Sequence, residues 1–120
     1  MSRLTFPKKF RITKRPLYLA CYSRGRRYFT PHFILFVLPQ DLGHWRLGIA
    51  VSKKIGSAVK RNRLKRLIKE FFRLHQNEIN LSADIVVVPK KTKDLDKLDL
   101  HKVEHELAAV INIIEKKHNP

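Results

Sequence analysis

The sequence has few of the residues and runs that mark several common classes of protein. It contains one cysteine, Cys21, which excludes an internal disulfide and a zinc site built from cysteines. The longest unbroken apolar run, Phe33 to Leu38, has six residues, whereas a membrane-spanning helix needs about 20. Met1 to Leu4 has the positive charge of a signal peptide, but no apolar stretch follows it. We therefore expect a cytoplasmic protein without a membrane segment.

Acidic residues are also scarce. The 120 residues include 26 Lys and Arg against 10 Asp and Glu, which gives a formal net charge of +16. No acidic residue precedes Asp41, and a dense group of cations follows between Lys53 and Arg73 with Glu70 as its single acid. The hydrophobic fraction of 43% is too high for a disordered basic tail. Cations concentrated in this way on a folded domain favour nucleic-acid binding over an anionic membrane surface or plain solvated faces.

The pattern of apolar residues predicts one domain, residues 1–120, of the α+β class. Thr13 is expected to cap a short helix that ends before Gly25, with Pro16 in its first turn. Strands are expected at 33–38, 46–52 and 84–89. Helices are expected from Ala58 to about Gln76 and from a cap at Asp96 or Asp99 onward. This order predicts one sheet with helices packed on it. General statistics make the strand–helix–strand crossover from Arg46 to Val88 right-handed.

The helix expected after Ser57 is the most informative segment. Cations at the start of a helix oppose the positive end of its dipole, so Lys60, Arg61 and Arg63 are unfavourable for the free helix. A bound phosphate would reverse that effect, because free backbone N–H groups and these side chains all point at the anion. A solvated face without a partner would carry interspersed Glu, and only Glu70 interrupts the run. The buried stripe of this helix is expected to be Leu64, Leu67, Ile68, Phe71 and Phe72.

No set of residues predicts an active site within the protein. His101 and His105 match the H-x-x-E-H spacing of one class of zinc proteases. However, Val103 and Leu107 are expected on the buried face of that helix, so a metal site is not expected there. A lone cysteine in a short apolar helix is usually a core residue, so Cys21 is not expected to act as a nucleophile. The sequence also has no Gly-rich phosphate loop.

Aromatic and basic residues alternate in the first third of the chain. Aromatic faces beside cations form platforms on which single-stranded bases stack, but plain packing explains the same residues equally well. The aromatic residues are Tyr18, Tyr22, Tyr28, Phe29 and Phe36, and the cations among them are Arg24, Arg26 and Arg27. Phe33, Trp45, Phe71 and Phe72 are expected in the core or at its edge.

One stretch of the chain reads Ser52-Lys53-Lys54-Ile55-Gly56 and then Ala58-Val59-Lys60-Arg61-Asn62-Arg63-Leu64-Lys65-Arg66. This stretch resembles the signature of the protein subunit of bacterial ribonuclease P. The hallmark of that family is the Arg-Asn-Arg run, and the order of elements fits over nearly the whole chain. The resemblance implies a role in removing the 5′ leader of precursor tRNA, with the chemistry and the Mg²⁺ belonging to the catalytic RNA subunit and no cofactor bound tightly by the protein. The implied partners are that RNA and precursor tRNA, in a one-to-one complex with an otherwise monomeric protein. The implied fold is a two-layer sandwich with a mixed sheet of about four strands, about three helices and a left-handed crossover.

The resemblance also assigns residues to two RNA surfaces. Contacts with the RNA subunit are implied for Lys53, Lys54, Lys60, Arg61, Asn62, Arg63, Lys65, Arg66 and Lys69. Contacts with the leader, in a cleft on the sheet, are implied for Leu17, Tyr18, Cys21, Phe36 and Ser52. The family often places two aromatics of the first helix in this cleft, and the matching positions here are Leu17 and Cys21. Either aliphatic side chains and Phe36 line the cleft, or the alignment of this helix is shifted by one residue, toward Tyr18 and Tyr22.

Two other functions stay open on the sequence alone. A ribosomal or RNA-chaperone protein would use the same charge without a role in cleavage. A DNA-binding protein would use residues 58–73 as a recognition helix, but that arrangement requires a helix and a short turn before Ser57, where a strand is expected.

Overall fold

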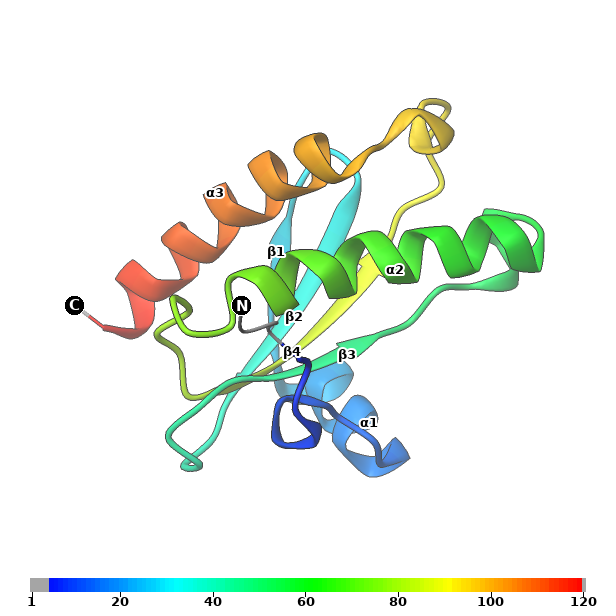
Figure 1. The fold of residues 1–120 in the computed structure, drawn as a ribbon. Helices are drawn as coiled ribbons and strands as arrows, with labels where there is room; N and C mark the ends of the chain where they lie inside the picture. Colours follow the sequence, from blue (N-terminus) through cyan, green and yellow to red (C-terminus); the bar gives the residue numbers. More distant parts are fainter. Residues whose placement is uncertain (1–4, 120) are drawn as a thin grey trace.

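Three helices cover both faces of one four-stranded sheet in the computed structural model, which describes residues 5–119 (Figure 1). The helices are α1 (Arg15–Arg24), α2 (Ala58–Leu74) and α3 (Leu100–His118), and the strands are β1 (Arg26–Phe29), β2 (Phe33–Pro39), β3 (Arg46–Ile49) and β4 (Ala83–Pro89). Met1 to Leu4, the segment with the charge of a signal peptide, lies outside the described residues. None of the described helices is long and apolar enough to cross a membrane.

The sheet is mixed, as expected, with the strand order β1-β2-β4-β3. β2 pairs antiparallel with both β1 and β4, whereas β3 pairs parallel with β4, so α2 is the crossover between two neighbouring parallel strands. In Figure 1, α2 lies in front of the sheet, β3 and β4 both run toward the right, and β4 ends above β3. This arrangement is left-handed, so the general expectation was wrong. Residues 50–57, with the 3-10 turn Lys53–Ile55, connect β3 to α2.

The two faces of the sheet bury different sets of side chains. α2 and α3 cover one face with the main core, which includes Trp45 and Phe33 and the α2 residues Leu64, Ile68, Phe71 and Phe72. α1 covers the other face, where Ile12, Cys21 and Val86 form a smaller cluster. Figure 1 shows α1 below the strands, on the side of the sheet opposite α2 and α3. The α1 face is therefore only partly covered, which leaves room for a ligand beside α1.

The capping residues of the long helices explain where they start. The Ser57 side chain accepts a hydrogen bond from the Lys60 amide at 3.3 Å, and the Asp99 side chain accepts one from the Lys102 amide at 2.9 Å. Ser57 thus caps α2 where a helix was expected to begin, and of Asp96 and Asp99 the structure uses Asp99 as the cap of α3. A carboxylate or hydroxyl at this position satisfies a backbone donor that has no partner within the helix.

Some element boundaries differ from those expected, and one strand was not expected at all. α1 follows Lys14 without a side-chain cap, so Thr13 does not cap it. β3 ends at Ile49 rather than at residue 52, because its ladder to β4 closes with the Ala50 amide on the Val87 carbonyl. α2 ends at Leu74, two residues before the expected end near Gln76, because the backbone of His75 leaves helical geometry. The pattern also missed β1, a four-residue edge strand that contains two arginines.

Candidate nucleic-acid interface

The start of α2 and the turn before it present the basic residues that the sequence singled out. All nine side chains assigned to RNA-subunit binding are exposed or half-buried in the structure. We call this set the basic helix surface: Lys53, Lys54, Lys60, Arg61, Asn62, Arg63, Lys65, Arg66 and Lys69. Its acidic neighbours are few, so these cations face solvent with most of their charge uncompensated.

Some members of the basic helix surface are held in place by the protein. Arg61 Nε donates to the Gly56 carbonyl at 3.3 Å, and Arg63 donates to the Leu98 carbonyl. Lys60 Nζ lies 3.1 Å from Asp96 Oδ2 in an exposed ion pair. Asn62, Lys65 and Arg66 have no polar partner among residues 5–119. The fixed arginines and the unpartnered side chains together offer donors of defined position to an anion.

A groove of about 440 Å³ continues this surface between α2 and α3. Glu70 is its single acid, and Arg73 Nε donates to Glu70 Oε2 at 3.0 Å. That hydrogen bond lowers the pKa of Glu70, so the carboxylate stays ionised and occupied by Arg73. The cations that remain in the lining are Arg63, Arg66 and Lys69. The lining of this groove therefore carries a net positive charge, which favours binding of a polyanion.

The second surface is a groove of about 420 Å³ on the α1 face of the sheet, which we call the sheet groove. The Tyr22 ring meets the Phe36 ring edge-on, with centroids 5.0 Å apart and planes at 83°. Ser52 is exposed at one side of the groove. The full lining is Tyr22, Phe36, Ala50, Val51, Ser52 and Val88. Aromatic faces in an apolar groove suit the bases of a single strand.

Tyr18 extends this aromatic wall along α1. Its ring lies so close to Gly48 that a Cβ atom there would be 2.6 Å from Tyr18 Cε1. The Tyr18 hydroxyl donates to the Ile12 carbonyl at 3.4 Å, and burial raises the pKa of this phenol. A second hollow, of about 450 Å³, adjoins Tyr18 and Tyr22 on α1. The absence of a side chain at residue 48 is what lets α1 settle against the sheet at this point.

The leader residues expected from the family pattern do not all lie at the groove. Phe36 and Ser52 line it, and Tyr18 lines the adjoining hollow. Leu17 is half-buried in the cluster under α1 and lines neither space. Cys21 has 0% exposure and turns its sulfur toward the Asp84 carbonyl at 3.9 Å, so a bound strand cannot touch it. The assignment of Cys21 was therefore wrong, because this residue faces the sheet.

Tyr22 is the residue that the assignment omitted. It lines both the sheet groove and the adjoining hollow. The signal was present in the sequence as the alternative alignment of the first helix, shifted by one residue. The structure favours that alternative, since the aromatic pair of α1 that faces open space is Tyr18 and Tyr22.

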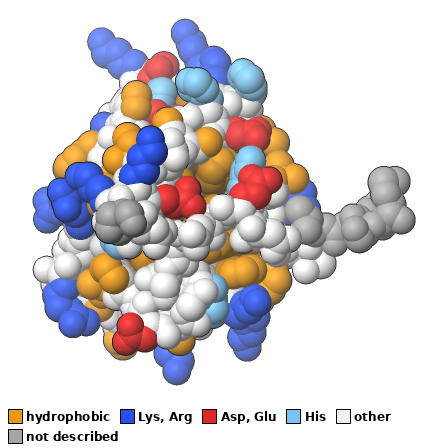
Figure 2. All heavy atoms as spheres, turned by 90° about the vertical axis from the view of Figure 1, so that its left-hand side faces the viewer, with side chains coloured by type: hydrophobic (Ala, Val, Ile, Leu, Met, Phe, Trp, Pro, Cys, Tyr) orange, Lys and Arg blue, Asp and Glu red, His pale blue; other side chains and the backbone are white. Residues whose placement is uncertain are grey.

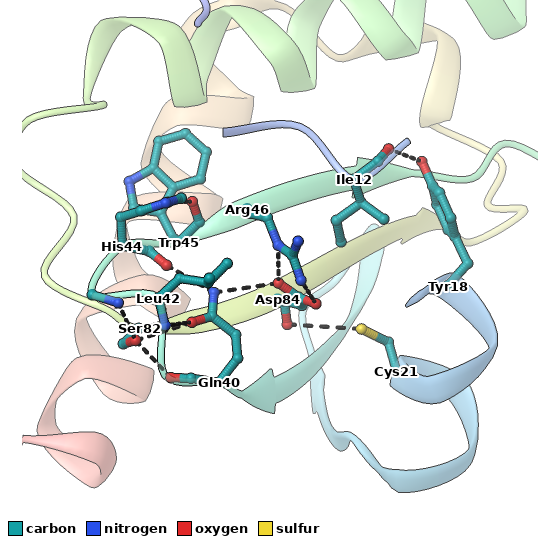
Figure 3. A network of polar contacts seen from close by, with 11 residues as sticks. Ile12, Tyr18, Cys21, Gln40, Leu42, His44, Trp45, Arg46, Ser82 and Asp84 are labelled. Carbon is teal, nitrogen blue, oxygen red and sulfur yellow. Dashed lines mark hydrogen bonds and ion pairs between the residues drawn. The ribbon is translucent and has the colours of Figure 1, made fainter. Parts of the chain in front are cut away.

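A network of polar contacts fixes the sheet beneath α1 (Figure 3). Arg46 Nε and Nη2 donate to Asp84 Oδ1 and Oδ2, both at 2.7 Å, and join β3 to β4. Asp84 Oδ1 also accepts from Gln40 Nε2 at 3.3 Å. The hydrogen bonds to Asp84 raise the pKa of Arg46. Burial, and then the charge of Asp84, raises the pKa of Cys21 to about 11, so this thiol stays protonated near neutral pH.

Other parts of the surface are less suited to a polyanion. A hollow of about 610 Å³ lies between the β1–β2 turn and α3, but Lys102 is the single Lys or Arg in its lining. Among residues 5–119, no group of three or more His, Cys, Asp or Glu side chains could hold a metal ion. In Figure 2, at the end of the molecule opposite the start of α2, acidic and histidine side chains lie among the cations.

Residues 52–57 connect the sheet groove directly to the basic helix surface. Ser52 lines the sheet groove, and its Oγ accepts from the Lys54 amide at 3.1 Å to cap the turn Lys53–Ile55. Gly56 follows with a φ of 147°, a conformation that favours glycine, and Ser57 then caps α2. The groove and the basic helix surface are thus held at a defined separation by a short, capped segment.

Comparisons with known proteins agree with this geometry. A family model described as Ribonuclease P matches residues 6–115. A protein of Desulfovibrio desulfuricans described as "Ribonuclease P protein component" is 48% identical over 113 residues, which cover 92% of this chain and 87% of that relative. These matches favour the ribonuclease P hypothesis over a ribosomal or RNA-chaperone protein.

Solved structures of similar proteins have the same fold. The RNase P protein of Staphylococcus aureus superposes with a TM-score of 0.78 at 32% identity, over 88% of this chain and 95% of that one. The RNase P protein of Thermotoga maritima gives a TM-score of 0.79 at 30% identity, over 86% and 96% of the two chains. The chain therefore belongs to the ribonuclease P protein family, as its Arg61-Asn62-Arg63 segment predicted.

Proposed function

We propose that this chain assists a catalytic RNA in removing the 5′ leader of precursor tRNA, with one protein bound to one RNA. The basic helix surface binds the RNA subunit, and the sheet groove holds the leader. The observation that carries the proposal is the pairing of a cationic helix start with an aromatic groove across residues 52–57. One surface suits a folded RNA backbone and the other suits an unpaired strand.

The residue types define the contacts at the basic helix surface. Arg61 and Arg63 are held by backbone carbonyls and can direct their remaining donors at phosphate oxygens. Asn62 can hydrogen-bond a base edge or a ribose 2′-hydroxyl, which distinguishes RNA from DNA. The lysines act as point charges on the backbone and displace counterions from it.

The chemistry itself is assigned to the RNA subunit. Mg²⁺ held by that RNA would activate the water that attacks the scissile phosphate. The protein contributes cations that reduce repulsion between two RNA molecules, and a groove that orients the leader. A net charge of +16 also disfavours self-association, so the free protein is proposed to be a monomer. Its site of action would be the bacterial cytoplasm, where the proposed substrate is made.

The direct test combines the pure protein with the catalytic RNA and a precursor tRNA at low Mg²⁺ concentration. We expect the protein to stimulate release of the leader strongly. Cleavage at the same rate with and without protein would reject the proposed function and favour an RNA-binding protein without a role in processing.

A paired substitution tests the basic helix surface. We expect Arg61→Ala with Arg63→Ala to weaken binding to the RNA subunit and to reduce the slope of log K against log salt by about 1.8, because two phosphate contacts are lost. The matched control is Lys116→Ala with Lys117→Ala, which removes the same charge from the exposed end of α3. Equal slopes in the two double variants would remove α2 from the interface. Thermal unfolding of both variants would separate binding from stability.

A further inference from the structure

Arg27 lies beside the sheet groove on a strand that the family resemblance did not connect with RNA. It is directly opposite Phe36 in the register of β1 and β2. Its guanidinium lies over the Phe36 ring, 5.6 Å from the ring centroid, while Tyr22 meets the same ring edge-on. Since Phe36 and Tyr22 both line the groove, Arg27 stands at its rim.

The guanidinium is positioned but not neutralised. Arg27 is exposed and has no ion pair with any residue from 5 to 119. A cation–π contact holds the guanidinium near the Phe36 ring without using its N–H donors in a hydrogen bond. Donors fixed in this way lose little conformational entropy when they bind a phosphate.

The groove lacks the charge that a bound strand needs. Its lining is aromatic, aliphatic or hydroxyl-bearing and includes no Lys or Arg. A single-stranded nucleic acid would place bases against Tyr22 and Phe36, but its phosphates would remain uncompensated there. Among the described residues, Arg27 is the cation in cation–π contact with a side chain of the groove lining.

We propose that Arg27 binds a backbone phosphate of the leader strand that occupies the sheet groove. The inference rests on the proposed function and adds the edge strand β1 to the substrate interface. The contact is independent of leader sequence, because it is made to the backbone rather than to a base.

The neighbouring arginine provides a matched control. Arg26 precedes Arg27 on the same edge strand and is also exposed, so its removal changes the net charge equally. Successive side chains of a strand point to opposite faces, and Arg26 lies over the ring of Tyr28, 5.8 Å from its centroid. Tyr28 belongs to the core on the other face of the sheet, away from the groove.

The test measures binding of precursor and mature tRNA to the complex of protein and catalytic RNA over a range of salt concentrations. We expect Arg27→Ala to weaken precursor binding by about tenfold, to leave mature tRNA binding unchanged, and to reduce the salt slope for the precursor by about 0.7. Arg26→Ala should change neither ligand's binding. Arg27→Lys should restore the salt slope, because it restores the charge.

Three results would overturn the inference: equal effects of Arg26→Ala and Arg27→Ala, an equal loss for mature tRNA, or a slope that Arg27→Lys does not restore. These results are distinct from failure of the proposed function. In that case the unaltered protein would itself give no preference for precursor over mature tRNA. Circular dichroism of each variant would show whether the sheet is intact.

Discussion

Tyr18 and Gly48 make the contact on which the geometry of the α1 face depends most directly. The ring of Tyr18 occupies the space that any side chain at residue 48 would need. Aromatic packing on a backbone surface fixes how deeply α1 sits, and with it the position of Tyr22 at the groove. The lack of a side chain at Gly48 thus determines the shape of the proposed leader site.

Gly48→Ala is expected to destabilise the protein by about 1–3 kcal/mol, because the new methyl group overlaps the Tyr18 ring. Urea unfolding would measure the free energy. Tyr18→Leu provides the partner for a double-mutant cycle, since the smaller side chain leaves room for the methyl group. We expect the double variant to lose less than the sum of the two single losses. Simple additivity would mean that the contact with Tyr18 is not what excludes alanine.

At the scale of elements, two histidines hold α3 on the rest of the fold. His32, between β1 and β2, contacts Glu106 Oε1 through Nδ1 at 3.0 Å and Asp94 Oδ2 through Nε2 at 2.9 Å. His75, after α2, contacts Glu104 Oε1 through Nε2 at 2.9 Å and Glu78 Oε2 through Nδ1 at 2.7 Å. Burial alone lowers the pKa of each histidine, but the carboxylates outweigh it and raise both pKa values.

These contacts predict a pH dependence of stability. A histidine whose pKa is raised on folding contributes fully below its unfolded pKa of about 6.5, and the contribution is lost as pH rises through the higher folded value. We therefore expect a larger free energy of unfolding at about pH 6 than at about pH 8.5. His32→Gln with His75→Gln should reduce this difference. His105→Gln, an exposed histidine of α3, should preserve it. An unchanged pH difference in the double variant would contradict the prediction.

The elements differ in how far the sequence predicts them. α2 and α3 were predictable because their apolar residues recur on one helical face and Ser57 and Asp99 supply caps. β1 was not, because it buries only Tyr28 and depends on its pairing with β2. The basic helix surface could be predicted because its chemistry lies within one helix. The sheet groove could not, since one residue of rotation in α1 decides whether Cys21 or Tyr22 faces outward.

At the scale of the whole molecule, the charge of +16 predicts that stability depends on anions. Cations on the basic helix surface repel one another and oppose the dipole of α2. A multivalent anion that binds only the folded state shifts the equilibrium toward it. RNA would do so most effectively, and a small anion should reproduce part of the effect.

Sulfate is expected to raise the midpoint of thermal unfolding by about 5 °C relative to chloride at the same ionic strength. The variant with Arg61→Ala and Arg63→Ala should gain less, because it lacks two of the cations at the start of α2. Differential scanning fluorimetry would compare the two proteins. An equal gain in both would assign the effect to general salt action on burial rather than to anions at this helix.

The capped segment from Ser52 to Ser57 has a consequence for RNA length. Six residues of fully extended chain would span about 20 Å, and the turn Lys53–Ile55 makes the segment shorter than that. At about 3.4 Å for each stacked nucleotide, that limit corresponds to at most about six nucleotides. With the proposed ligands in place, this segment would limit the length of leader between the RNA bound at α2 and the strand bound in the sheet groove.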